Sequence, residues 1–294
     1  MRYLLRRVPV VCFVAALAAQ QETAPPAPQP TRIHVIGASV SGGFRDGPLT
    51  GASEPGDSVT LQHVLKAWGG DLVKATTHPT LEMLAMFTKP AKIGEKQVLA
   101  AKKAQPDLVC AIDFPFWFAY GYVEGEEGPA RRALLQQGLA LLQQLTCPVL
   151  VGDLPDMQGA ARRMLAPAQI PSPALLQELN QLLAAFVAEH KNVRLVPLAA
   201  LVATMKDQGV VLPLAGGALQ TAPGALLQGD RLHANRLGMA FLGLQLQSHL
   251  QAALGAAHPL GKQSWALEQF IAACGAEGDL ELVRAAKAGA AAGK

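Results

Sequence analysis

Short apolar runs alternate with longer segments of helical periodicity along most of this chain, and no other feature constrains the fold as strongly. Five runs have the composition of buried strands: residues 33–36, 71–75, 108–112, 149–151 and 193–196. Parallel strands need long crossover connections, usually helices, and strands that are apolar throughout are typical of a sheet covered on both faces. The pattern predicts an α/β fold, a three-layer α/β/α sandwich with a five-stranded, mainly parallel sheet.

The connecting segments carry apolar residues at spacings of three and four, which predicts helices over residues 59–68, 129–145 and 173–190. A further helix over 235–254 closes the domain. Residues 209–221 are punctuated by glycine and β-prone, so we expect a hairpin or an irregular excursion there. Residues 256–294 form an Ala-rich tail with a helical segment around 264–273.

The first 19 residues have the features of a secretory signal peptide: three arginines, an apolar stretch over 8–19 and small residues suited to cleavage. The alternative is an uncleaved anchor, but a dozen apolar residues are short for a membrane span of about 20. We expect an exported protein, periplasmic or secreted, without a stable membrane span after cleavage. Residues 20–31 form a Pro-rich linker before a domain over 32–255.

Charge and cysteine content exclude several classes of protein. Of 25 basic residues, three arginines lie in residues 1–19, which leaves 22 basic against 22 acidic residues. Because nucleic-acid binders concentrate basic residues, we expect no nucleic-acid partner. Cys110, Cys147 and Cys274 are widely spaced and odd in number, which disfavours a disulfide framework. Without CxxC or HxxxH spacing, we expect no metal and no cofactor.

The first predicted strand runs directly into a Gly-rich turn that contains Ser39. Ligands bind at the carboxyl ends of strands in open parallel sheets, and glycines let a substrate approach the backbone amides. Ser39 is therefore the candidate nucleophile. Ser41 is the competing candidate, although it can also cap the following helix. A phosphate cradle is disfavoured because neither GxGxxG nor GK[ST] is present.

Asp230 and His233 lie three residues apart, shortly before the last predicted helix. A serine hydroxyl attacks poorly at neutral pH unless an imidazole takes its proton, and a carboxylate must orient that imidazole. Asp230 and His233 can supply both groups. Taken alone, the spacing favours a pair that caps the helix or forms a surface ion pair, and only the order of the two motifs along the chain favours a catalytic role.

Together, the two motifs resemble the SGNH/GDSL family of serine hydrolases over about residues 32–250. The matching residues are Gly37, Ala38, Ser39, Gly43, Asp230, His233, Asn235 and Gly238. The resemblance implies a flavodoxin-like sandwich and a triad of Ser39, Asp230 and His233. It also implies hydrolysis of a carboxylic ester.

The chain departs from the family pattern where oxyanion donors are expected. Asp113 stands where a Gly-x-Asn-Asp motif would follow the third strand, and the expected glycine after the second strand is missing. A separate departure is tolerable: Ala38 replaces an acid of the family that is not itself part of the triad. Oxyanion or pocket candidates are Gly43, His78, Asp113, Phe116 and Trp117. The aromatic segment around Phe116 can equally be a lid or part of the core.

We therefore expect an exported serine esterase whose partner is a small-molecule or carbohydrate ester, meaning an acyl or acetyl ester of a carbohydrate, lipid or small molecule. Two alternatives stay open. One is an SGNH-fold binding module that has lost turnover, because the family's oxyanion residues are missing. The other is a carbohydrate acyltransferase, which would use the same triad.

Overall fold

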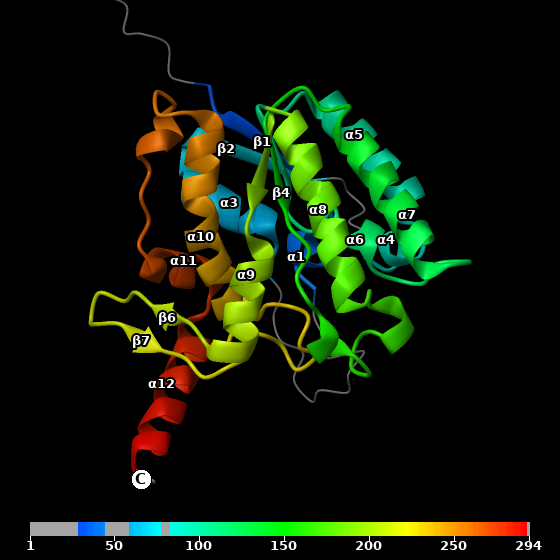
Figure 1. Cartoon of the computed structure of the whole chain (residues 1–294). Coiled ribbons are helices and arrows are strands. Elements are labelled where there is room, and N and C mark those ends of the chain that lie inside the picture. Colours follow the sequence, from blue (N-terminus) through cyan, green and yellow to red (C-terminus); the bar gives the residue numbers. More distant parts are fainter. Residues whose placement is uncertain (1–28, 45–58, 78–82, 293–294) are drawn as a thin grey trace, which may run out of the picture.

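Five parallel strands in the order β2–β1–β3–β4–β5 form the sheet in the computed structural model, which describes residues 29–44, 59–77 and 83–292 (Figure 1). The strands are β1 (Thr31–Val35), β2 (Val73–Thr77), β3 (Leu108–Ala111), β4 (Val149–Gly152) and β5 (Val193–Val196). Each begins and ends within two residues of its predicted range, and the α/β/α fold is confirmed.

The segment that follows β1 lies at the topological switch point of the sheet, where open α/β sheets commonly bind ligands. Val35, the last residue of β1, pairs with Thr77 of β2 and with Cys110 of β3. The chain passes from β1 to β2 on one side and then builds β3, β4 and β5 on the other. Crevices in open α/β sheets form at the carboxyl ends of strands where the order reverses, here between β1 and β3.

Helices cover both faces of the sheet (Figure 1). On one face lie α3 (Leu61–Gly69), α10 (Arg236–Leu254) and α11 (Leu267–Cys274), and on the other α5 (Pro90–Ala104), α7 (Glu127–Leu142) and α8 (Pro173–Glu189). Side chains of a strand alternate between faces, so Leu108 and Cys110 join the first core while Val109 and Ala111 join the second. This double burial explains why β3 and β4 are apolar throughout, whereas β1, β2 and β5 each include polar or charged residues.

Several elements connect these layers. The remaining helices among the described residues are α1 (Ser39–Gly42), α4 (Met83–Thr88), α6 (Phe116–Ala119), α9 (Leu198–Ala203) and α12 (Glu277–Ala292). Short 3-10 or π turns lie at Gly70–Leu72, Gln158–Ala160, Pro167–Gln169, Thr204–Gln208 and Pro259–Lys262. The expected excursion over 209–221 contains an antiparallel ladder of β6 (Val211–Leu212) and β7 (Leu219–Gln220). Helix α12 extends away from the sheet (Figure 1).

Some sequence-based expectations fall outside the described residues. These are the signal peptide over 1–19, residues 20–28 of the linker and His78. The described part begins shortly before β1, and Thr31, which closes the predicted linker, is already part of that strand. Within the described part, no helix is both long and apolar enough to cross a membrane, and no cluster of three or more potential metal-ligating side chains occurs.

Candidate active site

The turn after β1 presents Ser39 at the first position of the one-turn helix α1. Gly37 has a φ of +133°, and Gly43 ends α1 in the left-handed conformation with a φ of +73°, where its amide donates to the Ser39 carbonyl. Residues with a Cβ rarely adopt these angles, so the glycines allow the chain to leave the strand and turn within seven residues. Ser39 is 95% buried, with a relative exposure of 5%.

Two side chains that are distant in sequence form hydrogen bonds with the backbone of this turn. Gln97 of α5, which is fully buried, bonds both the amide and the carbonyl of Gly37. Asp113, which follows β3, accepts hydrogen bonds from the amides of Ala38 and Val40 at 3.2 and 3.0 Å. Asp113 is 3% exposed and supports the turn instead of lining the pocket beside Ser39. Sequence analysis did not identify Gln97, because a single polar residue in a helix carries no motif.

His233 and Asp230 form a buried hydrogen-bonded pair. Oδ2 of Asp230 lies 2.5 Å from Nδ1 of His233, and Oδ1 accepts from the amides of Leu232 and His233 at 2.9 and 3.0 Å. Burial by itself raises the pKa of Asp230, but the hydrogen bond and positive charge of His233 and the two amides more than offset this, so the pKa lies below its ordinary value. Arg231, between them, adopts a left-handed φ of +60° that helps the loop close on itself.

Ser39 and His233 line the same small pocket, together with Gly43, Phe44 and Met239. The ring of Phe44 stacks on the imidazole, with centroids 4.0 Å apart and planes inclined by 27°. Nε2 of His233 is buried and has no hydrogen-bond partner among the described residues. No hydrogen bond between Ser39 and His233 is formed in this described part of the chain.

Gln228 ties the turn of Ser39 to the loop of His233. Its Nε2 donates to the carbonyl of Phe44 and to the carbonyl of Ala234, both at 2.8 Å. The two segments are separated by almost 190 residues in sequence but are linked here through one side chain. Neither Phe44 nor Gln228 was identified from the sequence, because neither belongs to a recognisable spacing pattern.

Ser41, the competing candidate nucleophile, uses its hydroxyl in a hydrogen bond within the protein. Oγ of Ser41 donates to Oδ1 of Asp113 at 2.6 Å, and the residue is fully buried. Its hydroxyl is therefore committed to the carboxylate beneath the turn. Ser41 is also not among the residues that line the pocket beside His233.

Phe116 and Trp117 belong to the core of the α5–α7–α8 face and do not line the pocket of Ser39. Phe116 stacks on Tyr120 with ring centroids 4.0 Å apart. The fully buried Arg131 of α7 donates to the carbonyls of Ala119 and Gly121, which secures the end of this segment inside the protein. Of the two interpretations left open by sequence, the structure places these rings in the core.

Asn235 begins helix α10 directly after the His233 loop. Its side chain accepts from the amide of Gly238 at 2.8 Å and donates to the carbonyl of Ala225 at 2.8 Å. A Cβ on Gly238 would lie 2.2 Å from the carbonyl oxygen of Leu226, so this close approach requires glycine. Both residues thus fix the end of the loop that carries His233.

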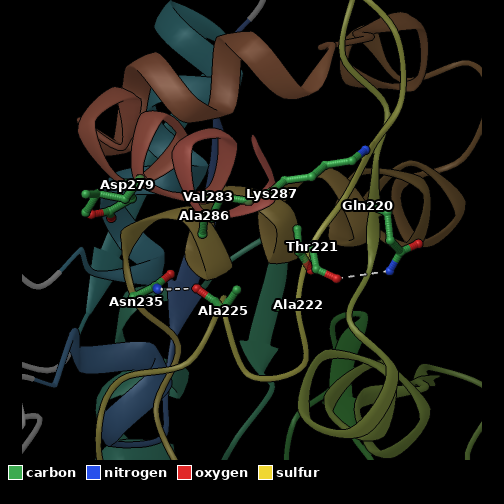
Figure 2. A pocket seen from close by; sticks show the side chains of 10 residues that line it. Gln220, Thr221, Ala222, Ala225, Asn235, Asp279, Val283, Ala286 and Lys287 are labelled. Carbon is green, nitrogen blue, oxygen red and sulfur yellow. Dashed lines mark hydrogen bonds between the residues drawn. The ribbon is translucent and has the colours of Figure 1, made fainter. Parts of the chain in front are cut away.

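A larger groove lies behind this loop, between α12 and the segment from β7 to α10 (Figure 2). Its lining is mainly apolar, with Asp279 and Lys287 of α12 at its edges. Asn235 lines both this groove and the pocket of Ser39, so the two are neighbours.

Comparisons with known proteins give little similarity. No protein-family model matches the sequence, and no curated protein sequence matches it. Among solved structures, a gut microbial diltiazem-metabolizing enzyme is similar at 10% sequence identity and a TM-score of 0.43, over 79% of this chain and 48% of that one. The chain thus spans about half the length of that enzyme. We therefore base the function on the chain's own residues.

Proposed function

We propose that this protein is a serine hydrolase that cleaves carboxylic esters, with Ser39 as nucleophile, His233 as general base and Asp230 as its orienting carboxylate. The observation that carries the proposal is the free Nε2 of His233. Buried polar atoms almost always have a partner, and leaving one without costs free energy. Here Nδ1 is bound to Asp230, while Nε2 has no partner among the described residues and belongs to the pocket that Ser39 lines.

The proposed reaction proceeds in two halves. Oγ of Ser39 attacks the ester carbonyl carbon while Nε2 of His233 takes the hydroxyl proton, and Asp230 stabilises the imidazolium. The tetrahedral intermediate expels the alkoxide, which receives that proton and leaves as the alcohol. Water then attacks the acyl-serine with His233 again as base, releasing the carboxylic acid and restoring Ser39. Hydrogen bonds between such groups often tighten only when substrate binds.

The oxyanion donor in this scheme is the amide of Ser39. Asp113 accepts hydrogen bonds from the amides of Ala38, Val40 and Ser41, but not from the Ser39 amide that lies among them in sequence. The Ser39 amide has no acceptor among the described residues. Since removal of one oxyanion donor typically reduces rates about 100- to 1,000-fold, a hole built on few donors predicts slow turnover.

We further propose that the protein acts after export, on an acyl or acetyl ester of a carbohydrate, lipid or small molecule. If an alcohol of a second sugar enters in place of water, the same acyl-serine would make the protein an acyltransferase. The second candidate function is a binding module of the same fold without turnover. It is favoured by the absence, in the described part, of a hydrogen bond between Ser39 and His233.

A fluorophosphonate probe distinguishes these functions. The chain over residues 20–294, its Ser39→Ala variant and its Ser41→Ala variant are treated with the probe and assayed with p-nitrophenyl acetate. We expect labelling and turnover in wild type and Ser41→Ala, and neither in Ser39→Ala. Wild type that neither labels nor turns over would support the binding module. Equal labelling of Ser39→Ala and wild type would show that another residue is the nucleophile.

A further inference from the structure

The side chain of Gln97 makes two hydrogen bonds to one residue of the Ser39 turn. Its Oε1 accepts from the amide of Gly37 at 2.8 Å, and its Nε2 donates to the carbonyl of Gly37 at 2.7 Å. Gln97 is fully buried on α5, 60 residues away in sequence. A primary amide can donate and accept in this way without carrying charge.

Asp113 accepts several hydrogen bonds from the residues of the same turn that follow Gly37 and from Trp117. Besides the amides of Ala38 and Val40, its carboxylate accepts from the amide and the hydroxyl of Ser41 and from the indole of Trp117. All of these partners are donors, so the two carboxylate oxygens of Asp113 act as acceptors in every one of these contacts.

The turn cannot hold Ser39 in place by itself. Helix α1 has four residues, and a helix this short is not stable in isolation because its nucleation is unfavourable. Glycines at positions 37, 42 and 43 add backbone freedom that must be lost on folding. The orientation of the Ser39 hydroxyl therefore depends on contacts from other elements, and a displacement of about 1 Å can reduce rates about 100-fold.

We propose that Gln97 and Asp113 are positioning residues for Ser39. Gln97 fixes the peptide groups of Gly37 before the nucleophile, and Asp113 fixes the amides on both sides of it. Neither lines the pocket, so both act through the backbone of the turn. This inference rests on the proposed function, because it concerns the placement of the same nucleophile.

A Gln97→Glu variant tests the first residue through pH. A protonated carboxyl can still donate its O–H to the Gly37 carbonyl and accept from the Gly37 amide, whereas an ionised one directs an acceptor at that carbonyl. We expect the labelling rate of the variant, divided by that of wild type, to be near one at acid pH. The ratio should fall about 10- to 100-fold as the introduced carboxyl ionises, at a pH above about 4.3 because burial raises its pKa.

Gln169→Glu is the matched control. Gln169 is also buried, but its side chain accepts from the amide of Ala166 and, among the described residues, makes no hydrogen bond to the Ser39 turn, so its ratio should not depend on pH. Thermal melting at each pH shows that the labelled protein is folded. A flat ratio for Gln97→Glu in folded protein would overturn the positioning role of Gln97. Failure of wild type itself to label would overturn the proposed function and this inference with it.

Asp113→Asn tests the second residue. The amide has the same shape but presents an NH₂ group to donors, so the turn loses part of its support. We expect kcat for p-nitrophenyl acetate to fall about 10- to 100-fold while KM stays within about twofold, because Asp113 does not line the pocket. Unchanged kcat, or a loss confined to KM, would overturn its positioning role.

Discussion

Asp230 holds His233 through both its ring and its backbone, with Oδ2 at 2.5 Å from Nδ1 and Oδ1 at 3.0 Å from the amide nitrogen. One carboxylate thereby sets the orientation of the imidazole and the conformation of the loop that carries it. The arrangement leaves Nε2 as the atom able to accept a proton. Substitution of Asp230 should therefore affect catalysis and stability separately.

We predict that Asp230→Asn reduces kcat on the order of 10⁴-fold, because an asparagine amide favours the wrong tautomer of the imidazole. KM should change little. Kinetics with p-nitrophenyl acetate measure the effect, and Asp207→Asn, at an exposed aspartate, is the control expected to match wild type. A variant of Asp230 with wild-type kcat would exclude this residue from the triad.

The same substitution should change how stability depends on pH. The pKa of Asp230 is lowered in the folded protein, so ionisation favours folding above the ordinary aspartate pKa of about 3.9, and this stabilisation disappears as the pH falls through the folded-state pKa. The Tm difference between wild type and Asp230→Asn should be largest near neutrality and shrink below about pH 4. A difference that is constant down to pH 2.5 would contradict the proposed origin of the shift.

Replacement of Gly37 should disable the turn. A Cβ at this position would lie 1.9 Å from Oδ1 of Asp113, and the φ of +133° is unfavourable for alanine. We predict that Gly37→Ala abolishes fluorophosphonate labelling. Gly70→Ala also introduces a residue at positive φ but meets no atom within 4 Å, so it should cost about 1–3 kcal/mol in stability and leave labelling intact. Normal labelling of Gly37→Ala would mean that the turn can relax without consequence.

The stack of Phe44 on His233 should contribute to catalysis by holding the ring in place. We predict that Phe44→Ala lowers kcat about 10- to 100-fold, since a small displacement of a catalytic group is costly. Phe186 of α8 and His190, which directly follows that helix, form a stack of matching geometry with centroids 4.1 Å apart. Phe186→Ala should lower Tm but leave kcat unchanged below its melting range. Equal kcat effects for both variants would indicate a general loss of folded protein.

The three cysteines of residues 20–294 should differ in reactivity. Burial raises the pKa of Cys110 and Cys274 to about 12, so on the order of 10⁻⁴ of each thiol is ionised at pH 8. Cys147 is only half-buried. We predict that a disulfide reagent such as DTNB modifies Cys147 first in the native protein and all three thiols in guanidinium chloride. Mass spectrometry identifies the sites, and early modification of Cys110 would contradict its placement in the sheet.

Sequence patterns were most informative where the environment of a segment is uniform. The central strands β3 and β4 are buried on both faces, so their apolar runs stand out, and all five strands of the sheet were identified. Helix α5 was not predicted because its exposed face carries four lysines among few apolar residues. Residues 256–294 were expected to form a helical tail, but α12 was not delimited within it because its alanines and exposed surface show no strong apolar stripe. The assignment of Ser39, Asp230 and His233 as a triad stays a prediction.

The sequence alone determined the alternation of strands and helices, the glycine turn after the first strand and the Asp-x-x-His pair, because each is a pattern within a short stretch of chain. Only the tertiary structure revealed that Gln97 and Asp113 hold the Ser39 turn and that Phe44 stacks on His233. These contacts join residues 60 to almost 190 positions apart. Such pairings follow from packing of distant elements and leave no periodic signal in the sequence.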